Sequence, residues 1–123
     1  MKIDIFCHIF PEFAFHRWFE AAPNLKDMGK RVRNVRMLFY LDLRFRIMDQ
    51  FGDYRQVISM ASPPLEAFAG PEATPDLARI ANDAMAELVS RYPHRFAGFI
   101  ACLPMNNPTE AEGELHRAVI FAG

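Results

Sequence analysis

The sequence predicts an α/β fold built from three successive βα units with parallel strands. Three apolar segments have the length and composition of buried strands: residues 2–6, 54–60 and 96–103. Each is followed by a segment in which apolar residues recur at helical spacing. Strands joined by helices of this length run parallel, with right-handed crossovers.

The first predicted strand opens the chain and leads to His8. Residues 2–6 alternate too little between polar and apolar for a half-exposed strand, so we expect neighbouring elements to cover both of its faces. Pro11 ends the run. The strand therefore presents His8 near its carboxyl end.

A long insertion, about residues 11–40, follows this strand. Within it, residues 12–22 predict a short amphipathic helix that Pro23 ends. Residues 24–40 are expected to be irregular and are rich in basic side chains. The helix places its aromatic residues at i, i+3 and i+4 spacing: Phe15, Trp18 and Phe19. The basic side chains are Lys26, Lys30, Arg31, Arg33 and Arg36.

The second unit consists of a helix over residues 41–51, the strand over 54–60 and a proline-rich loop over 62–73. Gly52 supplies the C-terminal stop of the helix. One face of this helix is expected to carry its apolar residues: Leu43, Ile47 and Phe51.

The third unit begins with a helix over residues 74–92, which Pro93 ends. Thr74 offers a capping hydroxyl, Pro75 suits the first turn, and Asp76 lies near the positive end of the helix dipole. Its apolar stripe is Leu77, Ile80, Ala81, Ala84 and Leu88.

The third strand, residues 96–103, leads to a last helix that Asn107-Pro108 opens. Its apolar side is expected to carry Leu115, Ala118 and Val119. Three parallel strands alone would leave faces and edges uncovered, whereas a closed eight-stranded barrel takes about 250 residues. We therefore interpret residues 1–123 as the first three βα units of a (β/α)8 barrel, truncated after the third. A small three-layer α/β sandwich complete at 123 residues is the alternative.

Composition limits the classes of partner. The formal net charge of −1 favours neither nucleic acid nor an anionic membrane. Cys7 and Cys102 both lie in apolar segments, which indicates free thiols in a reducing setting. No segment has the features of a signal peptide, and no run of about 18 apolar residues could span a bilayer. We expect a cytoplasmic protein.

His8 is the main candidate for chemistry, because parallel barrels place their active sites at the carboxyl ends of the strands. A neutral imidazole there can bind a metal ion, or it can simply form a hydrogen bond in the core. Phe6, two residues earlier, cannot ligate. Alternation places Cys7 on the opposite face, as a small buried hydrophobe, and Asp4 on the His8 face, as a hydrogen-bonding group beneath the site.

Arg33 and Arg36 lie in the insertion that follows the first strand, on the side where barrel active sites gather. A guanidinium can grip a substrate carboxylate with two bonds, although a solvated basic loop is the commoner fate of such a run. The remaining histidines are expected at the surface: His16, His94 and His116.

Several motifs resemble the amidohydrolase superfamily, in the branch of aminocarboxymuconate-semialdehyde decarboxylase. The opening MKIDIFCHIFP resembles that family's first-strand signature, in which Asp-x-His-x-His is followed by a proline. The most specific match runs from Asn82-Asp83 through Tyr92-Pro93-His94-Arg95-Phe96 to Leu103-Pro104-Met105. Further similar segments are residues 26–36, 43–59 and 114–119.

This resemblance implies a barrel enzyme with a divalent metal, usually zinc, that decarboxylates or hydrolyses small carboxylated, often aromatic-derived substrates. It assigns His8 to the second metal ligand of the first strand and Arg33 to the substrate carboxylate, while Phe6 replaces the first ligand. It places no catalytic residue within this chain, and it implies a homodimer. A non-catalytic barrel relative, or a fragment without function of its own, is the competing interpretation.

Overall fold

A computed structural model, which describes residues 1–122, contains the three parallel strands that the sequence predicts. They are β1 (Lys2–Ile9), β2 (Tyr54–Met60) and β3 (Phe96–Phe99), in the sheet order β1-β2-β3. The bounds of β2 match the prediction. The α/β class and the parallel pairing are confirmed.

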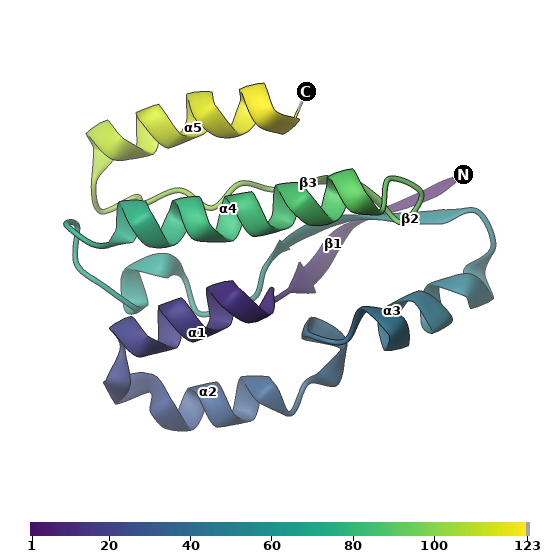
Figure 1. Cartoon of the computed structure of the whole chain (residues 1–123), viewed down its shortest axis with the longest axis horizontal. Helices are drawn as coiled ribbons and strands as arrows, with labels where there is room; N and C mark the ends of the chain where they lie inside the picture. The colour runs from purple at the N-terminus through teal and green to yellow at the C-terminus, as the bar shows by residue number, and fades with distance from the viewer. Residues whose placement is uncertain (123) are drawn as a thin grey trace.

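Five α-helices accompany the sheet in the described part of the chain: α1 (Glu12–Ala21), α2 (Lys26–Arg33), α3 (Leu41–Met48), α4 (Thr74–Arg91) and α5 (Pro108–Ala122). Short 3-10 turns lie at Pro23–Leu25, Arg36–Leu38, Asp49–Phe51 and Leu65–Ala67. Figure 1 shows α4 between α1 and α5, and it contacts both. None of the described helices is long and apolar enough to cross a membrane.

The core lies in two clusters that meet α4. One joins α1 to α4, where Trp18 is almost fully buried and its indole Nε1 donates to the Leu77 carbonyl at 3.0 Å. The other packs the strands against α4 through Ile9, Ile58 and Met85, with Phe96 beside them. Burying each such side chain stabilises the fold by about 1.5–3 kcal/mol.

β1 is longer than expected and lies at the edge of the sheet. Its first half is not covered on both faces, since Ile5 is 68% exposed and Phe6 79% exposed. The register against β2 also shifts between Asp4 and Cys7. An extra residue at such a bulge reverses the alternation of side chains beyond it.

This bulge corrects the expected position of Asp4. Paired residues of parallel strands project to the same face, and Asp4 pairs with Gln56, Cys7 with Ile58 and His8 with Ser59. Asp4 therefore lies on the face of Cys7, opposite His8. We call this the covered face, because Ile9, Ile58 and Phe96 pack there against α3 and α4. The open face is the one that carries Phe6, His8 and Ser59.

The basic segment expected to be irregular contains α2. Its Gly29 is buried against Phe19 of α1, where an added Cβ would lie 2.9 Å from the Phe19 ring. Val32 packs against the core cluster on the same side. Tertiary packing thus stabilises a short helix that has few apolar residues.

The helix predicted over residues 41–51 is present as α3 and the 3-10 turn after it, and Gly52 ends it with a φ of +72°. Its buried face is not the expected one, since Arg44 and Met48 are buried and Phe51 is 52% exposed. The apolar spacing was ambiguous because apolar residues lie on both sides of this helix.

Three further expectations are corrected at the third unit. Thr74 is not a cap but lies within α4, where its hydroxyl donates to Asn106 Oδ1 at 2.6 Å. β3 ends at Phe99 rather than residue 103, because the backbone of Cys102 is bonded to Asn82 of α4. Asn82 Oδ1 accepts the Cys102 N–H at 2.7 Å, and Asn82 Nδ2 donates to the Cys102 carbonyl at 2.9 Å. α5 buries Ala111, Glu114 and Ala118, whereas Leu115 and Val119 are exposed.

Candidate functional site

His8 lies at the carboxyl end of β1, half-buried on the open face. Its Nδ1 forms a 3.0 Å hydrogen bond with Ser59 Oγ, from the corresponding end of β2. This bond orients the imidazole and engages Nδ1. The other ring nitrogen, Nε2, is the one left for a ligand.

Arg44 holds the main chain of His8 from the covered face. This arginine of α3 is 4% exposed, and its Nη2 donates to the His8 carbonyl. Nη1 donates to Gln56 Oε1 at 2.6 Å, and Nε donates to the Met37 carbonyl at 3.3 Å. One side chain therefore joins β1, β2 and the end of the insertion, while burial lowers the pKa of its guanidinium.

Hydrogen bonds continue from Gln56 to the start of β1. Gln56 Nε2 donates to the Tyr54 hydroxyl at 3.2 Å, and that hydroxyl donates to Asp4 Oδ2 at 2.9 Å. Asp4 also accepts the Phe6 N–H at 3.0 Å, and these bonds lower the pKa of its carboxyl. Burial raises the pKa of the Cys7 thiol to about 11, so Cys7 is a structural thiol, as the sequence predicts.

The described residues do not by themselves form a metal centre. No three His, Cys, Asp or Glu side chains among them cluster closely enough to hold a metal ion. Phe6 occupies the position beside His8, with the two ring centroids 4.8 Å apart in an edge arrangement. His8 alone can supply one nitrogen ligand, so any remaining ligands must come from outside these residues.

Arg33 is the last residue of α2. Its Nη1 donates to Glu12 Oε2 at 2.7 Å, and this bond raises the pKa of Arg33 and lowers that of Glu12. The guanidinium carbon lies 4.3 Å from the Phe15 ring centroid and 4.4 Å from that of Phe39. Nε and Nη2 are left for a further partner.

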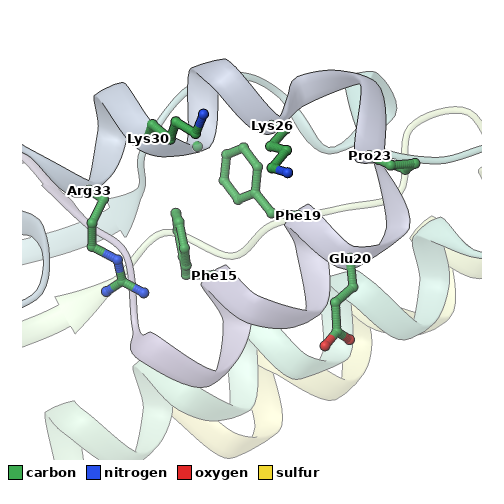
Figure 2. Close-up of a pocket in the computed structure, with 8 residues that line it drawn as sticks. Phe15, Phe19, Glu20, Pro23, Lys26, Lys30 and Arg33 are labelled. Carbon is green, nitrogen blue, oxygen red and sulfur yellow. The ribbon is translucent and has the colours of Figure 1, made fainter.

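Arg33 also lines a groove between α1 and α2, which Figure 2 shows in close-up. His8 is not among the lining residues, so this groove does not bring the two predicted site residues together. Arg36 is exposed beside the Tyr40 ring, and the histidines expected at the surface are exposed: His16, His94 and His116.

Sequence reasoning missed Ser59, Arg44 and Glu12. Ser59 could have been found, because the carboxyl ends of neighbouring parallel strands meet at one edge of the sheet. Arg44 was hidden, since a buried arginine is rare and its helix offered an alternative apolar face. Glu12 was predicted only as part of the helix over residues 12–22. Its ion pair with Arg33, 21 residues later, could not be predicted because it requires α2 to form and pack beside α1.

The sequence matches no family model, but it is similar to several curated proteins. It is 42% identical over 84 residues to the gamma-resorcylate decarboxylase of Polaromonas sp. strain JS666, which covers 68% of this chain and 26% of that protein. It is 38% identical over 89 residues to the gamma-resorcylate decarboxylase of Rhodococcus jostii strain RHA1, covering 72% of this chain and 27% of that protein. The chain thus spans about a quarter of the length of these relatives.

Solved structures agree over almost the whole chain. A dihydroxybenzoic acid decarboxylase from Polaromonas sp. JS666, with bound manganese and the inhibitor 2-nitroresorcinol, superposes with a TM-score of 0.73 at 33% identity. It covers 97% of this chain, which corresponds to 35% of that chain. A 2,6-dihydroxybenzoate decarboxylase complexed with 2,6-dihydroxybenzoate also reaches 0.73, at 29% identity over 97% of this chain and 36% of the other. The chain is therefore homologous to the N-terminal part of decarboxylases of the amidohydrolase superfamily.

Proposed function

We propose that this chain forms the first three βα units of a metal-dependent decarboxylase acting on small hydroxylated aromatic carboxylates. The observation that carries the proposal is the 42% identity to a gamma-resorcylate decarboxylase, combined with His8 at the carboxyl end of β1. These relatives favour decarboxylation over the hydrolysis that the sequence also allowed.

The open face supports the barrel part of this proposal. The inner strand surface of a (β/α)8 barrel is filled by further strands, whereas helices cover its outer surface. Here α3 and α4 cover one face, and Phe6 and Ile3 on the other are 79% and 47% exposed. The open face would then point to the barrel interior, with His8 at its mouth.

In the proposed site, His8 is one ligand of a divalent cation through Nε2. For Nε2 to offer its lone pair to the metal, Nδ1 would carry the proton and donate a hydrogen bond to Ser59 Oγ. The resemblance implies zinc, and the manganese of the Polaromonas structure makes manganese the ion to compare with it. When bound, the cation would supply positive charge for the substrate's oxygens.

Arg33 is the proposed partner of the substrate carboxylate. Glu12 engages only Nη1, so Nε and Nη2 remain to bind two carboxylate oxygens. The proposal also includes a homodimer and a cytoplasmic setting, the latter in keeping with the free thiols Cys7 and Cys102.

A chimera tests this function, because the chain spans only about a quarter of its relatives. The chain would replace the matching N-terminal segment of the Polaromonas decarboxylase. Three quantities are measured: release of carbon dioxide from 2,6-dihydroxybenzoate, zinc and manganese per subunit, and mass by sedimentation. We expect turnover, about one bound cation per subunit and a dimer.

Variants of the chimera separate the two site residues. His8→Ala should lower bound metal and turnover together, whereas Arg33→Gln should leave the metal in place and mainly raise KM. His94→Ala and Arg31→Gln are the matched controls, since both residues are exposed. A folded His8→Ala chimera that keeps its metal and its turnover would refute the role of His8.

A non-catalytic relative is the second candidate, and Phe6 is the observation that favours it. Its ring lies beside that of His8, with the centroids 4.8 Å apart, and the resemblance implies a metal ligand at this position. A large gain in metal affinity from Phe6→His would indicate a site that has lost a ligand. No gain, together with an inactive parent chimera, would support the non-catalytic candidate.

A further inference from the structure

The groove between α1 and α2 has a volume of about 440 Å³. That size is in the range of pockets that hold small organic molecules. Eight residues line it: Phe15, Phe19, Glu20, Pro23, Lys26, Gly29, Lys30 and Arg33. All lie in the insertion, and none belongs to β1.

The floor of the groove is aromatic and firmly packed. The Phe15 and Phe19 rings lie 4.7 Å apart between centroids, and Figure 2 shows both reaching from α1 toward α2. Gly29 lies against the Phe19 ring, and its lack of a side chain permits this close approach. Such a floor favours a flat apolar ligand that can stack or meet ring edges.

The rim of the groove is positively charged. Lys26, Lys30 and Arg33 come from α2, and Glu20 is the single acidic residue that lines it. Lys26 and Lys30 are exposed, and the Lys30 ammonium has only a long 3.5 Å contact with Asp27. Two ammonium groups above an aromatic floor match a ligand with a flat apolar body and one negative end.

We propose that this groove binds a small aromatic monocarboxylate, with its ring on Phe15 and Phe19 and its carboxylate between Lys26 and Lys30. The lining shares Arg33 with the proposed substrate site but excludes His8, and the proposed ligand contacts are Lys26 and Lys30, so binding here can be measured without turnover. Exposed ion pairs contribute little binding free energy, so stacking of the ligand's ring and attraction of its carboxylate to the two lysines must act together. We expect a dissociation constant of about 0.1–1 mM.

Calorimetry and two-dimensional NMR on the chimera test the site, with 1-naphthoate as the probe. The neutral 1-naphthamide tests the charge, and cyclohexanecarboxylate tests the flat ring. We expect both analogues to bind at least fivefold more weakly than 1-naphthoate. The backbone amides of Phe19 and Gly29 should show the largest shifts.

Charge-removing variants on one helix provide the matched comparison. Lys26→Gln with Lys30→Gln should weaken 1-naphthoate at least fivefold and leave 1-naphthamide unchanged. Arg31→Gln, on α2 but outside the groove, should change neither. Equal binding of the two naphthalenes, shifts centred on His8, or an equal loss in Arg31→Gln would overturn the proposal.

Discussion

The two faces of the sheet differ in what they contribute to the molecule. On the covered face, Ile58 and Phe96 are fully buried and Arg44 satisfies its hydrogen bonds with three uncharged partners. On the open face, Phe6 is exposed and His8 bonds to Ser59 beside it. Stability therefore comes from one face of these strands, and candidate chemistry lies on the other.

The largest expected effect compares one phenylalanine from each face. Phe96→Ala removes a buried ring that packs against Phe45 and α4, and it should lower the free energy of unfolding by about 3–5 kcal/mol. Phe6→Ala should change it by no more than about 0.5 kcal/mol. Urea denaturation of both variants measures this difference. Similar losses in the two would mean that the open face is packed in solution.

The second comparison tests whether the covered face depends on Arg44. Arg44→Met keeps the length of the side chain but leaves Gln56 Oε1 and the His8 carbonyl without their donor. We expect a loss of about 2–3 kcal/mol in unfolding free energy. Arg46→Met, on the exposed side of α3, should cost less than about 0.5 kcal/mol. An unchanged Arg44→Met protein would contradict the role given to this arginine.

The smallest effect is a pH dependence of the covered face. The folded-state pKa of Cys7 is raised to about 11, above its unfolded value. The contribution of the neutral thiol to the free energy of unfolding is therefore complete at pH values below the unfolded pKa. It is lost as the pH rises through about 11. As the pH rises from about 8 to about 11, the urea midpoint of unfolding should therefore fall less in Cys7→Ala than in the parent protein. Part of the fall should persist, since burial also raises the pKa of Tyr54.

The order of elements could be predicted from the sequence because strong local signals mark it. Residues 54–60 are a short segment around Val57 and Ile58 between turns, and the apolar stripe of α4 repeats over several turns. Gly52 and Pro108 mark the end of one helix and the start of another. These signals act within a few residues, so tertiary contacts did not override them.

What could not be predicted depends on contacts between distant residues. The bulge in β1 reverses the alternation between Asp4 and His8, and only the pairing with β2 reveals it. β3 stops early because of Asn82, which lies 20 residues before Cys102. The pairing of His8 with Ser59 spans 51 residues. For the candidate site, the sequence could therefore identify His8 but not what holds it.

The bulge in β1 has a consequence for how such a protein can change over generations. Phe6 lies within the bulge, where no residue of β2 pairs with it, and its ring is on the open face, so a substitution at position 6 touches neither core cluster of the described residues. Within these three units, a side chain that binds metal and one that does not should then differ little in folding free energy. In a barrel, contacts from further strands, and not the core of these units, would limit which side chains selection can place at this position.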